Sequence, residues 1–207
     1  MRVSMVVPVI FSCLIIFIIW LQYEKRKADK SSKKLSDDFW QTEYEANSIR
    51  RADITALDYI TIPIDQLPME DQDDLATNSY RDAILMLSKK QIINLTGLTN
   101  TELKLKYGTA NINKLMECDS NYTILVRTLQ KWGDRLFSQG HLSEAIAVLE
   151  FAVVCLTEVS DTYKLLATLY KEQMFPNKID QLIEAVPNTN IRSKDTLIHF
   201  LSEIKNN

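Results

Sequence analysis

Side chains that commonly carry catalysis or bind metals are few and widely separated in this chain. The only histidines are His141, which follows Gly140 in a turn signal, and His199, close to the C-terminal end of the sequence. Neither has a cysteine or carboxylate neighbour at metal-ligand spacing, whereas a zinc site needs three or four ligands. The sequence contains no Gly-x-Ser-x-Gly nucleophile turn and no Gly-rich phosphate loop. We therefore expect no enzymatic activity, no cofactor and no metal.

The acidic run Glu70–Asp74 is the segment whose composition comes nearest to a calcium loop. An EF-hand loop alternates oxygen ligands and needs a central glycine and a closing glutamate. Counting from Asp71, the fifth and sixth positions are Leu75 and Ala76, which cannot serve as side-chain ligands. We interpret the run as a solvated loop that leads into the next helix.

The three cysteines, Cys13, Cys118 and Cys155, form no closely spaced pair. Cys13 lies in an apolar run and the other two lie in helical patterns. Disulfides are rare in reducing compartments, where cysteines are used singly. This usage favours a reducing compartment for the folded part.

The first residues form an apolar run without any charge from Val3 to Leu21. As a helix, these residues would span roughly 28 Å, about the thickness of the hydrocarbon layer. No small-residue exit of the Ala-x-Ala kind follows, which favours a retained anchor over a cleaved secretory signal. The sequence therefore predicts a transmembrane anchor over residues 1–23.

A basic cluster follows this run. Its members are Lys25, Arg26, Lys27, Lys30, Lys33 and Lys34. By the rule that cations flank the inner end of a span, the cluster predicts a single-pass membrane protein with its C-terminal part in the cytoplasm. The same cations would be attracted to anionic headgroups, each by about 1 kcal/mol near the surface. Setting the topology is the simpler of these two roles.

Charge excludes one class of partner. Beyond residue 34 the chain keeps 17 cations and 25 acids, a net charge of −8. Nucleic-acid-binding proteins present a basic face. We therefore expect no nucleic-acid partner.

The chain divides by composition into four parts: the anchor over residues 1–23, a basic juxtamembrane linker or helix extension over 24–38, a mixed segment over 39–77, and an all-helical domain over 78–207. The mixed segment combines a weak helix, an extended stretch and the acidic loop. Within it, Pro63 and Pro68 exclude a helix over residues 54–68. A lone strand is marginal, so this stretch must lie along another part of the fold. We hypothesise that it occupies the chain's own binding groove.

Two helical hairpins are predicted in the C-terminal half. Leu125, Leu129, Trp132 and Leu136 form one apolar stripe, and Gly140 ends that helix. The next helix, over residues 143–156, is apolar nearly all round, so it must be covered on more than one side. Equivalent small and large residues recur after 34 positions, as in Gly133 and Ala167 or Leu136 and Tyr170. Such a period is typical of stacked helix–turn–helix units.

The best unit resembles the tetratricopeptide repeat. The matching pattern is Gly133-x-x-Leu136-x-x-x-Gly140-x-x-x-x-Ala145-x-x-x-Leu149-x-x-Ala152. We assign the best repeat to residues 122–157, a second to 161–187 and a closing helix to 194–205. The second unit departs from the pattern at Met174, Ile179 and Val186, which puts its helix turn in doubt. The predicted fold class is thus all-α, with one N-terminal transmembrane helix followed by a small array of antiparallel helix hairpins of this kind.

The resemblance implies a function and a site. In the repeat family the first helices of successive units line a concave groove that binds peptides. Carried over by position, the groove residues would be Arg127, Gln130, Asp134, Phe137, Lys164, Thr168, Lys171 and Glu172. We expect a membrane-tethered scaffold that binds a protein or peptide partner through this groove. The alternative is a non-catalytic regulatory or assembly subunit that joins a membrane complex through its transmembrane helix.

Overall fold

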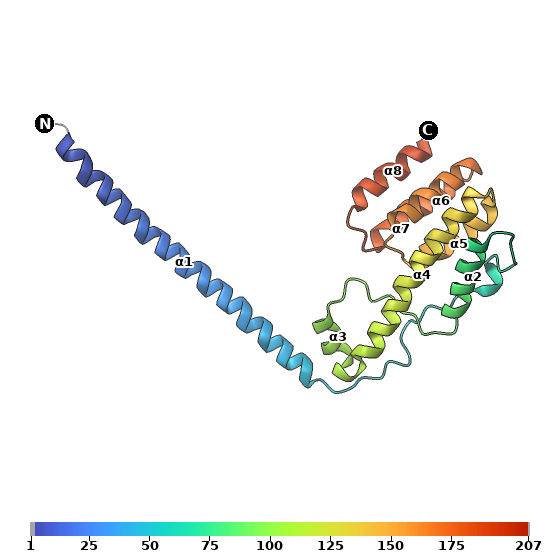
Figure 1. Cartoon of the computed structure of the whole chain (residues 1–207), viewed down its shortest axis with the longest axis horizontal. Coiled ribbons are helices and arrows are strands. Elements are labelled where there is room, and N and C mark those ends of the chain that lie inside the picture. The colour runs from blue at the N-terminus through green and yellow to red at the C-terminus, as the bar shows by residue number, and fades with distance from the viewer. Residues whose placement is uncertain (1–2, 207) are drawn as a thin grey trace.

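The computed structural model describes the backbone from Val3 to Asn206 and the side chains of residues 14–30 and 32–206. Over these residues the chain is helical and contains no β-strand, so the all-α part of the prediction agrees. The helices are α1 (Val3–Ser48), α2 (Leu75–Leu87), α3 (Asn100–Tyr107), α4 (Ile112–Ser138), α5 (Leu142–Val154), α6 (Ser160–Glu172), α7 (Pro176–Ala185) and α8 (Lys194–Asn206), with short 3-10 turns η1 (Ile64–Gln66), η2 (Thr109–Asn111) and η3 (Val186–Asn188). Figure 1 shows α1 extending away from a body formed by the other helices.

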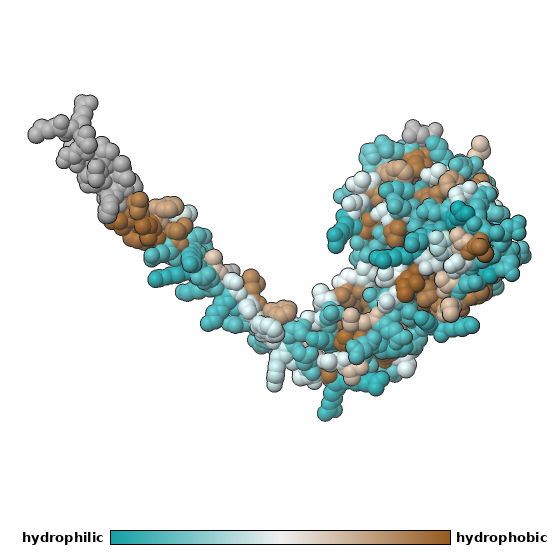
Figure 2. Space-filling model, in the orientation of Figure 1, coloured by the Kyte–Doolittle hydropathy of each residue, from teal (hydrophilic) through white to brown (hydrophobic). Residues whose placement is uncertain are grey.

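The predicted transmembrane anchor over residues 1–23 requires correction. The side chains of residues 1–13 lie outside the described part of the chain, and within that part no helix is long and apolar enough to cross a membrane. The side chains from Leu14 to Leu21 are exposed, and Figure 2 shows an apolar patch on α1 far from the body. Charges from Glu24 onward then continue in the same helix.

The expected basic linker over residues 24–38 is part of α1, which continues without a break to Ser48. Its last turns dock on α3. Ala46 is fully buried there, and Glu43 accepts a hydrogen bond from Thr101 and pairs with Lys104 at 2.7 Å. The body therefore fixes only the end of this long helix, and the exposed basic cluster lies beyond the contact.

The segment over residues 54–68 contains no α-helix, as its prolines predicted, but it is extended only in part, because a turn at residues 55–57 and the 3-10 turn η1 interrupt it. It packs into the body. The Ile60 N–H donates to the Ile92 carbonyl over 2.8 Å, and Ile62 and Leu67 are buried in the main hydrophobic core. Tyr59 packs instead against a second, smaller core under α3. No hydrogen bond in the described residues joins the segment to a predicted groove residue. The segment is thus a structural part of the domain.

α4 is one continuous helix of 27 residues. Two of its polar residues anchor a neighbouring extended segment: Asp119 accepts from the Leu95 N–H, and Asn121 donates to the Gln91 carbonyl. This segment follows the end of α2 at Leu87 and runs along α4.

The first hairpin, formed by α4 and α5, is held by a close helix crossing. Leu125, Leu129, Trp132 and Leu136 are all fully buried, as the apolar stripe predicted. At Gly133 the two helices approach so closely that an added Cβ would lie 2.5 Å from a methyl carbon of Leu149. Only a residue without a side chain fits this crossing.

The second hairpin, formed by α6 and α7, repeats the first after the same 34 positions that separate equivalent residues in the sequence. The turn between its two helices repeats as well. Gly140 has φ +83° and Met174 has φ +58°, so both occupy the left-handed region. The His141 N–H donates to the Leu136 carbonyl over 3.0 Å, and the Phe175 N–H donates to the Tyr170 carbonyl over 2.8 Å. These bonds close the helix end in the same way. The turn forms although Met174 replaces glycine.

Several helix ends between α4 and α8 follow the same spacing of 34 residues. α4 and α6 end at residues 138 and 172, and α6 and α8 begin at residues 160 and 194. α5 begins at residue 142 and α7 at residue 176. α5 packs between α4 and α6, which covers its apolar surface on two sides, and α8 packs on α6 and α7. The predicted closing helix, α8, therefore occupies the place that the first helix of a third hairpin would take.

The two equivalent turns allow a matched stability test. Gly140→Ala should destabilise the fold by about 1 kcal/mol, because an L-residue resists the left-handed conformation. No other atom lies within 4 Å of the added Cβ, so the effect is one of backbone alone. Met174→Gly should stabilise by roughly 0.5–1 kcal/mol, because relief of strain exceeds the entropy cost of glycine. Met174→Ala is the control and should be nearly neutral. Denaturant unfolding measures all three, and a destabilising Met174→Gly would contradict the turn geometry.

The helix crossing gives a second test. Gly133→Ala should cost about 1–3 kcal/mol, because its methyl group overpacks against Leu149. In a Leu149→Ala background the same substitution should be neutral or stabilising, because the clash is gone and alanine favours a helix by up to about 1 kcal/mol. Equal costs in both backgrounds, measured as free energies of unfolding, would show that Gly133 and Leu149 are not in contact.

Candidate functional site

The predicted groove residues lie on α4 and α6, and four of them are exposed. Arg127, Asp134, Lys171 and Glu172 reach solvent, so they present both signs of charge along neighbouring helices. The first helices of the hairpins, α4 and α6, form a row with α8, and the helices of this row run in the same direction. Lys164, early in α6, lies over the ring of Phe200 in α8, and Lys205, late in α8, pairs with Asp180 of α7. The first helices thus lie parallel and side by side, as Figure 1 also shows.

Three further groove residues serve packing. Gln130 is 9% exposed, and its Oε1 accepts a hydrogen bond of 2.5 Å from the buried Thr162 hydroxyl, which ties α4 to α6. Phe137 packs against the main core. The Thr168 hydroxyl donates to the Lys164 carbonyl one turn earlier in its own helix. The part of this row that a partner could contact is therefore smaller than the eight predicted groove residues implied.

Lys164 is the one groove cation that the structure holds in place. Its ammonium group lies 3.1 Å from Asp161 Oδ1 and 6.0 Å from the centre of the Phe200 ring. Because both contacts are partly exposed to water, each contributes little to stability. They fix the position of the charge between α6 and α8.

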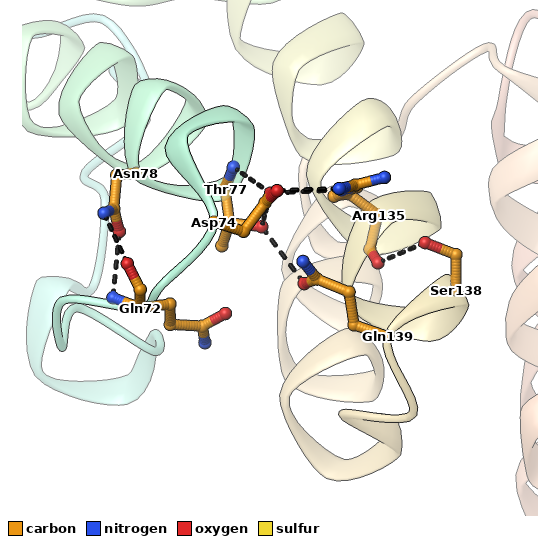
Figure 3. Close-up of polar contacts among 7 residues, drawn as sticks. All are labelled: Gln72, Asp74, Thr77, Asn78, Arg135, Ser138 and Gln139. Atoms are coloured by element: carbon orange, nitrogen blue, oxygen red, sulfur yellow. Dashed lines mark hydrogen bonds and ion pairs between the residues drawn. The ribbon is translucent and has the colours of Figure 1, made fainter.

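The acidic loop, which we expected to be solvated, contains a structural residue. Asp74 is the N-cap of α2, and its Oδ2 accepts from the Thr77 N–H over 2.8 Å. Arg135 of α4 donates to both of its oxygens, over 2.7 and 3.0 Å, as Figure 3 shows. These donors, Arg135 first and then Thr77, hold the pKa of the Asp74 carboxyl well below its ordinary value. The aspartate thus joins α2 to the end of the first hairpin.

Gln72, in the same acidic loop, forms hydrogen bonds to α2 and α5. Gln72 exchanges two hydrogen bonds with Asn78, and its Nε2 donates to Glu144 Oε2 over 2.6 Å. Figure 3 shows Gln72 and Asn78 on the side of Asp74 that is away from Arg135. In the sequence, the capping role of Asp74 was detectable only from the nearby Thr77, since Arg135 lies in a distant part of the chain.

One hollow in the described structure was not predicted from the sequence. A cavity of about 540 Å³ lies where the extended segments meet the C-terminal ends of α5 and η3. Its lining includes Leu98, Val154 and Leu156, together with Asn94, Asn188 and Asn190. Adjoining hollows of about 370 and 260 Å³ share Leu95 and Leu98 with it, and the first of these also includes Arg127. Residues 94–98 therefore form a wall between three hollows.

The two cysteines in the described part are buried. Cys118 is fully buried and Cys155 is 4% exposed. Burial raises the pKa of the Cys155 thiol to about 12, which leaves almost no nucleophilic thiolate near neutral pH. Within the described residues, no three His, Cys, Asp or Glu side chains gather in a way that could hold a metal ion.

Comparison with models of known protein families, with curated proteins and with solved structures found no match to this chain. The resemblance to the tetratricopeptide repeat therefore stays a prediction from the sequence. The structure itself defines the class of protein more coarsely, as an all-α chain in which helical hairpins recur with a constant displacement along the sequence.

Asp74 gives a prediction about pH. Because its pKa is lowered in the fold, its ionised form stabilises the protein above the unfolded pKa, about 3.9, and this contribution is lost as the pH falls toward the folded pKa. Asp74→Asn should therefore be less stable than the parent at pH 7, with a difference that shrinks below about pH 4. Asp73→Asn, at an exposed neighbouring position, is the control and should change stability little. Urea unfolding across this pH range measures the effect. A constant difference would show that Arg135 and Thr77 do not act on the ionised carboxylate.

Proposed function

We propose that this chain is a non-catalytic interaction module that holds a protein or peptide partner against the row formed by α4, α6 and α8. The observation that carries the proposal is the constant displacement between these helices, which extends through their bounds and their turns. Repeated hairpins of this kind build extended surfaces that serve for binding. A surface of helix faces, without a cluster of reactive groups, suits recognition better than turnover.

The charges on the row support a polar partner of mixed sign. Arg127 and Asp134 lie on one side of α4, two helical turns apart, and Lys171 and Glu172 lie at the end of α6. Such exposed charges steer association and select partners more than they add affinity. The partner should therefore carry acidic and basic groups in an order that matches the row.

Lys171 offers the sharpest test of the surface. A photoreactive amino acid placed at Lys171, or at Arg127, of the full chain should crosslink to the same partner in the cells that make the protein. The same label at Lys90, which is exposed in the turn after α2, should not. Crosslinking of equal strength at all three positions would contradict a partner on the row.

Charge reversal provides the quantitative part of this test. Lys171→Glu should weaken capture of the crosslinked partner by about three- to tenfold, because a favourable contact becomes a repulsive one. Lys90→Glu makes the same change of net charge away from the row and is the matched control. Equal losses in both variants would indicate a general effect of charge, and no loss in either would place the partner elsewhere.

A further inference from the structure

The hollow of about 540 Å³ beside residues 94–98, here called the amide cleft, lies away from the exposed row. One side is formed by the extended segments that include Ile60 and Asn94, and the other by the end of α5 and by η3. The Asn190 Nδ2 donates to the Thr96 carbonyl over 3.0 Å and so joins the two sides. The cleft therefore has walls from both hydrophobic cores of the body.

Large apolar side chains line this cleft and still face water. Val154 is 75% exposed, and Leu98 and Leu156 are each 42% exposed. Leu98 also lines the adjoining hollow of about 260 Å³, together with Met116, which is 49% exposed. Exposed apolar surface that gathers around one hollow marks binding sites more often than scattered residues do. The lining thus offers several apolar contacts in succession.

The polar part of the lining matches a peptide backbone. Asn94, Asn188 and Asn190 carry carboxamides, each of which has two N–H donors and one carbonyl acceptor. Asn94 uses its own within the fold, because its Nδ2 donates to the Tyr122 hydroxyl and the Cys155 carbonyl and its Oδ1 accepts from the Thr96 N–H. Asn188 and Asn190 are exposed and face the cleft opening. A peptide group carries the same complement, one donor and one acceptor. Asn190 uses one N–H for the Thr96 carbonyl, which leaves its second N–H and its oxygen for a ligand.

The charges of the lining select the class of ligand. Lys106 and Asp58 are the only charged residues among those that line the amide cleft, and they are of opposite sign. A balanced lining has no complementarity to a polyanion or to an isolated cation. It complements a ligand that is polar but uncharged along its length, as a polypeptide backbone is.

We propose that the amide cleft binds an extended segment of a partner polypeptide. The side chains of Asn188 and Asn190 pair with its backbone groups, and Leu98, Val154 and Leu156 contact its apolar side chains. Side chains of an extended segment point alternately to opposite sides, so successive ones reach different hollows around the wall of residues 94–98. The cleft has none of the row's four exposed charges in its lining, and the row is met only at Arg127, in the adjoining hollow of about 370 Å³. The cleft would therefore recognise apolar sequence where the row recognises charge.

A phage-displayed library of linear peptides, selected on the immobilised full chain, tests the proposal. The selected peptides should be rich in apolar residues at alternate positions and should show no preference for net charge. Val154→Glu should weaken the binding of a selected synthetic peptide by about tenfold or more, because it places a charge among apolar contacts. Val154 is mostly exposed at the end of α5, so the fold should tolerate this change.

Two controls make the result decisive. Met86→Glu introduces the same charge at another apolar side chain, which is 70% exposed on α2 and outside the cleft, and binding should stay within about twofold. Lys171→Glu alters the row and should likewise leave the peptide bound. Failure to select any peptide, or a peptide that Val154→Glu does not weaken, would overturn the proposal. A peptide released by Lys171→Glu alone would belong to the row and would also overturn it.

Discussion

The crossing of α4 and α5 at Gly133 is the contact on which the arrangement of the body depends. Because Leu149 fills the space where a side chain would lie, the two helix axes come close enough to bury the whole apolar stripe of α4. α5 is then covered by α4 on one side and by α6 on the other. The second hairpin continues this stack, with α6 against α5 and α8 against α6 and α7.

A second constraint is the left-handed residue that ends the first helix of each hairpin. Gly140 adopts this conformation at little cost, while Met174 adopts it against its preference and leaves its side chain 87% exposed. A strained turn persists only where the surrounding packing requires it. Here Tyr170 and Ile179, both almost fully buried on either side of the turn, supply that packing. The turn geometry of the array is thus set by packing more than by the local sequence.

Much of the helical part was readable from the sequence because its signals are local and periodic. The stripe from Leu125 to Leu136 and the turn at Gly140 are both present. The predictions of a transmembrane anchor over residues 1–23 and of a single-pass membrane protein were wrong, because no helix in the described part of the chain is long and apolar enough to cross a membrane. The site was harder to predict, because pairs such as Asp74 and Arg135, or Gln130 and Thr162, join residues far apart in the chain. The amide cleft is assembled from five separate segments, and no local sequence pattern predicts it.

The constant displacement of the hairpins is best tested by an experimentally determined structure of the full chain. We expect α6 and α8 to lie side by side and parallel, with corresponding residues such as Leu166 and Phe200 at the same height along the row. Residue 174 should have a positive φ, as residue 140 has. Antiparallel packing of α6 and α8, or a turn of another type at residue 174, would contradict the repeated array and the binding surface inferred from it.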